Sequence, residues 1–159
     1  MFRKMRRKNR EIQDRSVIDT LLETSRIGVL AVNGDEGYPY AIPINYYFDK
    51  ENNKIYFHGS KEGHKVDSLK KNNKVCFTVY GKEIVKDEEW APYVQSVVVF
   101  GKCHLLETTL EALDLLRLTA RKYYPSDELI EEEINMASKA VQIYVIDIEN
   151  ITGKEIQEK

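Results

Sequence analysis

The segment Phe57–Lys65 gathers side chains suited to holding an anion, because it combines two glycines, a serine, two histidines and two lysines. We expect a strand before it and a helix starting at Ser60, whose first N–H groups have no partner within the helix. Ser60, His64 and Lys65 can add hydroxyl, imidazole and ammonium donors, and glycines let a ligand approach the backbone. The segment indicates a phosphate site. It fits equally well an ordinary capped helix with exposed lysines.

A second feature is the aromatic run Tyr38–Tyr47, in which Pro39 and Pro43 interrupt an otherwise strand-like pattern. Proline cannot donate to a β-ladder, so we expect some backbone groups here to be free of strand pairing. Free polar groups beside aromatic rings suit the polar edge and flat face of a heteroaromatic ligand. The alternative is an edge strand whose tyrosines pack in the core.

Other chemistry-bearing residues give weaker signals. Trp90–Ser96 is a loop that enters a strand with two large aromatic residues, which suits a lid or an oligomer contact. Cys76 and Cys103 lie in strand-like apolar runs without a CxxC motif, which favours buried free thiols. His58 and His64 with Cys76 lack the ligand spacing of zinc sites, so we expect no metal site.

The elements that must position these residues are short strands at close spacing, with a few helices between them. Short polar turns join the first strands without crossover helices, which predicts antiparallel pairing. The expected strands are Ile27–Asn33, Tyr38–Phe48, Ile55–His58, Lys74–Tyr80, Tyr93–Leu106 and Val141–Ile148. The expected helices begin at the caps Asp14, Ser60, Thr108 (with Glu111 as a capping box) and Ser126, the last running to about Ser138.

This pattern predicts a mainly β protein with peripheral helices, arranged as a small six-stranded antiparallel barrel, since closure removes edge strands. An open α+β sandwich is the alternative. The length of 159 residues favours one domain, which we expect to span residues 16–159 after a basic arm at residues 1–15. The arm holds seven basic and two acidic side chains, whereas the remainder is acidic.

Composition excludes several classes of protein. With 42% hydrophobic and 31% charged residues, the chain is globular rather than disordered. No apolar run approaches the length of a membrane span, and no apolar segment follows the basic start, so we expect a cytoplasmic protein without membrane partners. No aromatic or groove-reading pattern accompanies the basic arm, so we expect no nucleic-acid partner.

In this order and spacing, the segments resemble the pyridoxamine-phosphate-oxidase-like FMN-binding split barrels, and most closely their nitroimidazole-resistance (Nim-type) branch. The resemblance covers about residues 1–105. It rests on Met5–Lys8 with Glu11–Ile12, Gly28–Ala31, Gly37–Tyr40 with Pro43–Tyr46, Ile55–His58 with Gly63–Lys65, and Ser96–Gly101. It implies a homodimer of six-stranded split β-barrels with FMN bound in clefts between the subunits.

The resemblance also assigns residues to the cofactor. The strand that lines the isoalloxazine ring falls on Pro43, Ile44, Asn45 and Tyr46, acting largely through main-chain hydrogen bonds. The phosphate-binding segment falls on His58, Ser60, Gly63, His64 and Lys65, and Ser96 would come from the partner subunit. In this family, a pyridoxine-phosphate oxidase holds its substrate with arginines on the flavin-contacting strand and an Arg/His pair near the C-terminus. Here residues 41–48 contain no arginine, and residues 141–159 contain neither arginine nor histidine. We therefore do not expect vitamin B6 oxidation.

Two classes of function follow. The first is an FMN-dependent oxidoreductase that passes electrons to small electron-poor compounds of the nitroaromatic type, with His64 or Tyr46 as the proton donor. The second is a non-catalytic module of the same fold that holds flavin or carries heme. A heme would need an axial imidazole from His58, His64 or His104, the only histidines in the chain.

Overall fold

The computed structural model describes residues 1–137 and 139–157. In these residues four α-helices surround one antiparallel sheet of seven strands, whose order is β2-β1-β5-β6-β7-β4-β3. The strands are β1 (Ile27–Asn33), β2 (Pro39–Asn45), β3 (Tyr47–Asp49), β4 (Lys54–Ser60), β5 (Lys74–Ile84), β6 (Tyr93–Leu106) and β7 (Val141–Gln157). The helices are α1 (Arg15–Thr24), α2 (His64–Lys71), α3 (Leu110–Arg121) and α4 (Asp127–Ala137), with short 3-10 turns η1 (Lys8–Arg10) and η2 (Asp35–Gly37).

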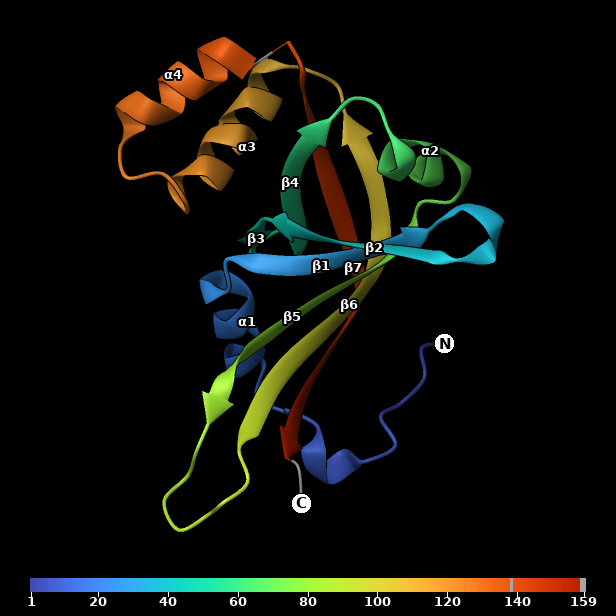
Figure 1. Ribbon diagram of the computed structural model, residues 1–159, viewed down its shortest axis with the longest axis vertical. Coiled ribbons are helices and arrows are strands. Elements are labelled where there is room, and N and C mark those ends of the chain that lie inside the picture. The colour runs from blue at the N-terminus through green and yellow to red at the C-terminus, as the bar shows by residue number, and fades with distance from the viewer. Residues whose placement is uncertain (138, 158–159) are drawn as a thin grey trace.

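The sheet curls into the split barrel expected from the sequence, with one strand more than predicted. The predicted strand Tyr38–Phe48 is divided at Tyr46 into β2 and β3. These are the two edge strands of the sheet: β2 pairs with β1 at one edge, and β3 pairs with β4 at the other. The chain therefore closes the curl covalently at this bend. The alternative of an open sandwich is not what forms. Figure 1 shows β5, β6 and β7 sweeping past this curl into a long extension.

The core fills the inside of the curled sheet with alternating strand residues. Its largest fully buried side chains include Tyr46, Phe57, Phe77 and Tyr144. Gly28 allows the close approach of Phe77, because a Cβ at Gly28 would stand 2.1 Å from the end of that ring. The ring of Phe77 in turn meets Tyr46 edge-on, with ring centroids 4.8 Å apart.

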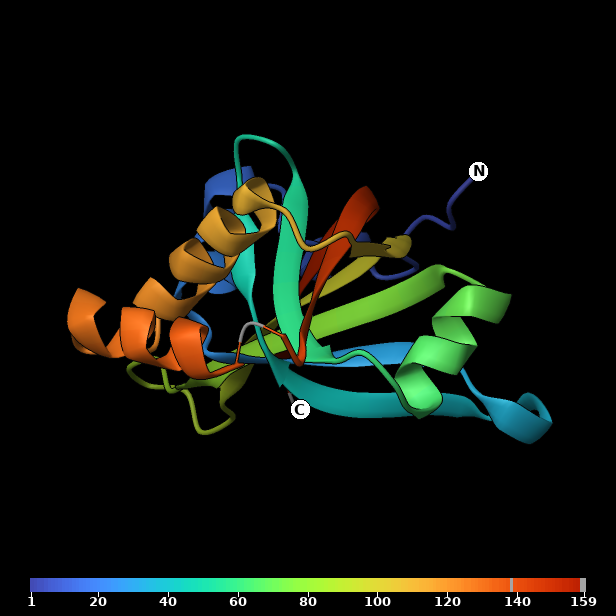
Figure 2. The same ribbon diagram turned by 90° about the horizontal axis from the view of Figure 1, so that it is seen from above.

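The helices lie at opposite sides of the barrel, as the two views in Figures 1 and 2 agree. Helices α3 and α4 form a small core of their own against β7, whereas α2 lies beside the η2 turn. That second core consists of Ala112, Leu116, Ile130, Ile134 and Ile143. No helix in the described part of the chain is long and apolar enough to span a bilayer.

Several expected boundaries shift. Asp14 caps α1 through the Ser16 N–H as predicted, but α3 is capped by Thr109 rather than Thr108. Strand β7 continues nine residues beyond the predicted end at Ile148, because its polar second half pairs with β6. Ser126 caps α4 as predicted, since its Oγ accepts from the Leu129 N–H. The predicted end of α4, Ser138, lies outside the described residues.

The basic arm is attached to the far end of the sheet. Glu11 bridges to Lys154, and the Ile12 N–H donates to the Gly153 carbonyl at 2.9 Å. Beyond this point Phe2 stacks on Phe100, with ring centroids 6.0 Å apart. The first residues of the arm therefore lie on the outer face of β6.

Candidate functional site

The anion-binding candidate is the connection between β4 and α2. Ser60 ends β4 instead of starting the helix, which corrects the predicted helix start, and its Oγ accepts from the Glu62 N–H at 3.2 Å. Helix α2 begins four residues later at His64, after Gly63, whose φ of 119° is a conformation that glycine tolerates best. Gly63 has no side chain to cap the helix, so N–H groups of the first turn remain available to an anion.

Lys65, in the first turn of α2, extends its amine over the end of the barrel. Its Nζ lies 4.5 Å from the ring centroid of Tyr144 and 5.4 Å from that of Phe57. A Cβ at Gly59 would stand only 2.7 Å from the same Nζ, so the amine lies directly over this glycine and would have to shift if a side chain were added there. Burial lowers the pKa of Lys65, and no carboxylate of the described residues acts on it. A half-buried ammonium in this position would gain from an anionic ligand.

His64 joins α2 to the first half of β2. Its ring stacks on Tyr40 with centroids 4.2 Å apart, and its Nε2 lies 3.5 Å from a carboxylate oxygen of Asp35 in η2. Asp35 also forms an ion pair with Lys71 at 3.2 Å. His64 and Lys65 follow one another at the start of α2, but the His64 ring contacts η2 and β2, whereas the Lys65 amine contacts β4 and β7. Their shared role at one phosphate site stays a prediction.

His58 occupies a different face of β4. Side chains alternate along a strand, so His58 points away from the face on which Gly59 meets the Lys65 amine. Burial, and then the charge of Lys65, lower the pKa of His58, so its imidazole is neutral at neutral pH. The His58 side chain therefore leaves β4 on the face opposite to the Lys65 amine, although the charge of Lys65 still acts on the pKa of His58.

Strand β2 is an edge of the sheet, and its prolines fit that edge rather than interrupting it, which corrects the expectation from sequence. Residues 39–45 pair continuously with β1. The Gly34 N–H donates to the Tyr38 carbonyl at 2.9 Å, which sets the alternation of the ladder. Pro39, Ala41, Pro43 and Asn45 then fall at positions whose backbone groups point away from β1. The free edge offers the Asn45 N–H and the Pro43 carbonyl to a ligand.

The side chains of the same segment divide between surface and core. Pro43 and Asn45 are exposed, Ile44 packs partly against the core, and the Asn45 amide donates to the Arg26 carbonyl at 2.9 Å. Tyr46 is fully buried, and its hydroxyl donates to the Leu22 carbonyl at 2.6 Å. Burial raises the pKa of Tyr46. This placement corrects the expectation that Tyr46 donates a proton to a substrate, because its hydroxyl is enclosed and already engaged.

Sequence reasoning missed Tyr123, which contacts this segment from the end of α3. The Tyr46 N–H donates to the Tyr123 hydroxyl at 2.8 Å, and that hydroxyl lies 2.7 Å from the Tyr46 carbonyl. The local sequence around Tyr123 does not predict this hydrogen bond, since a tyrosine after a helix is most often a packing residue.

Ser96 lies in the extension of the sheet, away from the other predicted residues. It pairs with Tyr80 and Lys154, whereas Lys102, further along β6, pairs with Lys74 next to α2. Six residues of strand separate the two positions, or about 20 Å. Within one chain the structure does not bring Ser96 to α2, and its expected contribution from a partner subunit stays a prediction.

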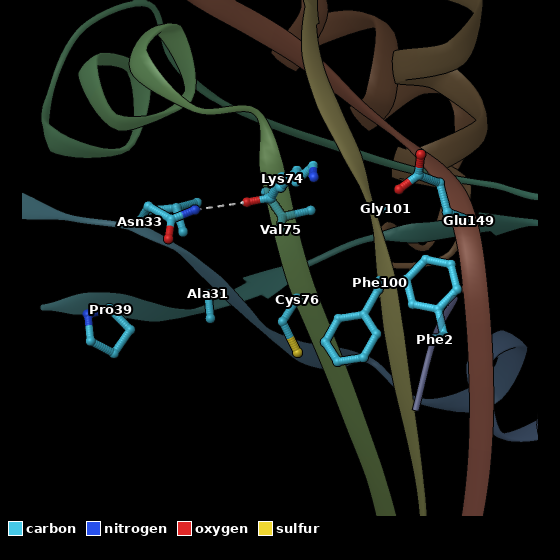
Figure 3. A pocket seen from close by; sticks show the side chains of 11 residues that line it. Phe2, Ala31, Asn33, Pro39, Lys74, Val75, Cys76, Phe100, Gly101 and Glu149 are labelled. Atoms are coloured by element: carbon cyan, nitrogen blue, oxygen red, sulfur yellow. Dashed lines mark hydrogen bonds between the residues drawn. The ribbon is translucent and has the colours of Figure 1, made fainter. Parts of the chain in front are cut away.

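Two hollows lie on the outer face of the sheet, away from the core. The first, of about 480 Å³, is shown in Figure 3; it is lined by Phe2, Asn33, Pro39, Cys76, Phe100 and Glu149, among others. The second, of about 930 Å³, includes Pro43, Arg26, Ile27 and Tyr80. Neither hollow includes His64 or Lys65, but both border β2. Ile27 and Tyr80 are 60% and 70% exposed, so this face presents apolar surface in the single chain.

Comparison with known proteins agrees with this geometry. Residues 14–155 match the sequence model of the family described as pyridoxamine 5'-phosphate oxidase. A solved structure of a candidate 5-nitroimidazole antibiotic resistance protein from Bacteroides thetaiotaomicron VPI-5482 is similar at 23% identity and a TM-score of 0.77, covering 92% of this chain and 87% of that chain. No curated protein matches the chain.

Two further solved structures are described by the cofactors they bind. An FAD-binding protein from Mesorhizobium loti is similar at 20% identity and a TM-score of 0.64, covering 94% of this chain and 97% of that chain. An FAD and heme binding protein from Mycobacterium smegmatis is similar at 19% identity and a TM-score of 0.70, covering 91% of this chain and 72% of that chain. At these identities the likeness establishes the split-barrel fold.

Proposed function

The chain belongs to the pyridoxamine 5'-phosphate oxidase family, and on that premise we propose that it is an FMN-binding oxidoreductase for small electron-poor compounds. The observation that carries the proposal is the Lys65 ammonium, half-buried without a carboxylate partner in the described residues, beside an uncapped helix start. A doubly charged phosphate supplies what this arrangement lacks.

The residues present fit FMN in two parts. His64, Lys65 and the N–H groups after Gly63 would hold the phosphate, with the Ser60 hydroxyl at the entrance. The free edge of β2 at Pro43 and Asn45 would meet the polar edge of the flavin ring through backbone groups. His58 leaves β4 on the opposite face, so its assignment to the phosphate stays a prediction from the resemblance.

We propose a homodimer as the working form. The outer face of β1 and β5 exposes apolar side chains beside β2. The family resemblance implies that a second copy of the chain covers this face. In that arrangement Ser96, which lies about 20 Å along the sheet from α2 in its own chain, would reach the site of the partner.

Bound FMN supplies transfer of two electrons from a donor to an acceptor, which no side chain of this protein can supply. The protein positions the ring, holds the phosphate and leaves an open approach for a small acceptor. His64 is the candidate proton donor that lies at the surface, since the Tyr46 hydroxyl is enclosed. No arginine on β2 or β7 is available to a phosphorylated substrate, which argues against vitamin B6 oxidation. Nitroaromatic acceptors are proposed from the similarity to the candidate 5-nitroimidazole resistance protein.

The test is spectroscopic. Purified protein, supplied with FMN and freed of excess, should show flavin absorbance, and the absorbance should bleach anaerobically with NADH or NADPH and return when a nitroimidazole is added. Protein that retains flavin but is not reoxidised by nitro compounds would support the flavin-holding module instead. Protein that takes up no flavin would exclude both.

A heme-binding or FAD-binding module is the second candidate, favoured by the descriptions of the Mycobacterium smegmatis and Mesorhizobium loti proteins. His58 is the histidine best suited to ligate heme iron, because burial lowers its pKa and keeps the imidazole neutral, and no hydrogen bond, ion pair or ring contact of the described residues engages it. The His104 ring is hydrogen-bonded to the Asp147 carboxylate, and the His64 ring stacks on Tyr40. A Soret band on addition of hemin, lost in His58→Ala, would identify this alternative.

A further inference from the structure

The bend between β2 and β3 is held by a hydroxyl from a distant part of the chain. At Tyr46 the backbone leaves both ladders, so its N–H and carbonyl need other partners. The Tyr123 hydroxyl accepts from the Tyr46 N–H at 2.8 Å and lies 2.7 Å from the Tyr46 carbonyl and 2.8 Å from the Arg26 carbonyl. Its single proton serves one of these two carbonyls at a time.

Neighbouring residues hold Tyr123 in this position. The Lys122 amine donates to the Ser25 carbonyl and lies 4.1 Å from the ring centroid of Tyr46. The Arg26 guanidinium lies 4.9 Å from the ring centroid of Tyr123 and donates to the Lys122 carbonyl at 3.2 Å. Burial raises the pKa of Tyr123, which keeps the hydroxyl protonated and able to donate at neutral pH.

The contact reaches the proposed flavin-binding residues directly. Asn45 precedes the bend, and its side-chain amide donates to the same Arg26 carbonyl that Tyr123 approaches. The strand segment that carries the free backbone groups of Pro43 and Asn45 therefore ends at a bend whose position depends on Tyr123, just after α3. Helices α3 and α4 pack in their own small core, so the Tyr123 hydroxyl links a separate packing unit to the edge of β2.

We propose that Tyr123 is a positioning residue for the flavin ring: through the backbone of Tyr46 it sets the orientation of the β2 end that would contact the isoalloxazine. The inference rests on the proposed flavin site. Tyr123 touches neither the ring nor a substrate, and it acts by fixing the polar groups that do. Loss of its hydroxyl leaves the Tyr46 N–H without its partner and frees the bend to move.

The test compares Tyr123→Phe with the matched control Tyr124→Phe, which removes a hydroxyl from the adjacent and more exposed tyrosine. Dissociation constants are measured for both FMN and riboflavin, together with the shape of the visible flavin band and the midpoint potential of the bound flavin. We expect Tyr123→Phe to weaken both ligands by about 5-fold, the loss that follows if the displaced β2 end no longer makes one of its hydrogen bonds to the ring, and to shift the band and the potential. Tyr124→Phe should change none of these.

Several results would overturn the inference. If Tyr123→Phe only lowers the melting temperature, with unchanged affinity, band and potential, the residue is merely structural. If wild-type protein binds no flavin, the proposed function fails as well, which distinguishes the two failures. Should Tyr123→Phe not fold, amide exchange at Tyr46 in wild-type protein decides: saturating FMN should slow it, and an unchanged rate overturns the coupling.

Discussion

Replacing Lys65 by methionine tests the phosphate assignment most sharply. Methionine keeps the length of the side chain and packs well beside the rings of Phe57 and Tyr144, but it removes the ammonium. Riboflavin carries the same ring system as FMN without the phosphate. The ratio of the two dissociation constants therefore isolates what the protein gains from the phosphate, independently of how well the ring binds.

The expected magnitude follows from the surroundings of the amine. A hydrogen bond to a charged group contributes about 1.5–3 kcal/mol, which corresponds to about a 10- to 150-fold loss of FMN affinity in Lys65→Met. In the ligand-free protein the same change removes a cation–π contact of about 0.5–2 kcal/mol but also removes a charge whose burial is unfavourable. We expect these two effects to offset each other, so that the free energy of unfolding changes by less than about 1 kcal/mol.

The assay is fluorescence titration of both flavins, with urea unfolding of the ligand-free proteins alongside. Lys61→Met is the matched control, because it removes the ammonium of an exposed lysine from the same connection and reports long-range charge effects. Lys65→Met should lose most of the preference for FMN over riboflavin, and Lys61→Met should retain it. An unchanged preference in a folded Lys65→Met variant would refute the inference that the half-buried ammonium awaits a phosphate.

Three further changes test the fold around the site. Burial, and then the charge of Arg26, lower the pKa of Lys122 to about 8. Between about pH 8 and pH 10 the unfolded chain therefore binds more protons at this residue than the folded chain, so the free energy of unfolding of the wild type should rise over this range relative to that of Lys122→Met. Urea unfolding measures both proteins, and a constant difference between them would contradict the prediction. Gly28→Ala should destabilise by about 1–3 kcal/mol because its Cβ meets Phe77, and adding Phe77→Leu should recover part of the melting temperature; equal melting of all three proteins would show that the core adapts freely. Thr109→Ala should cost about 1 kcal/mol by removing the α3 cap on the Ala112 N–H, while the same change at Thr108 should cost less; equal losses would favour the cap predicted from sequence.

The sequence predicts most elements of the fold because local patterns determine them. Short apolar runs rich in β-branched and aromatic residues mark β1, β4 and most of β6, and side-chain caps mark the starts of α1 and α4. The second half of β7 escapes prediction because its side chains are only half-buried and polar residues such as Glu149 and Lys154 break the apolar alternation. Pairing with β6 over the whole length of β7 supplies the stability that local propensity does not.

The sequence predicts which residue types form the candidate site, but not on which face of a strand or helix each side chain lies. The glycines, histidines and lysines of residues 57–65 announce an anion site, yet the sequence does not show where α2 begins. Moving the helix start from Ser60 to His64 turns Ser60 into the last residue of a strand. Because side chains alternate along β4, the His58 side chain lies on the face opposite to the Lys65 amine. The sequence suggests one cluster because the two residues are only seven positions apart.

The bend at Tyr46 shows why the remaining part needed three dimensions. A run such as Tyr38–Phe48 reads as one strand, because nothing in it demands a break and both prolines fit an edge. The break becomes possible only when another group satisfies the Tyr46 backbone, and that group lies 77 residues away at Tyr123. Since the same bend ends the free edge of β2, the geometry offered to a flavin ring depends on a helix that carries none of the predicted site residues. A change in the packing of α3 should therefore alter ring binding while leaving the preference for FMN over riboflavin intact.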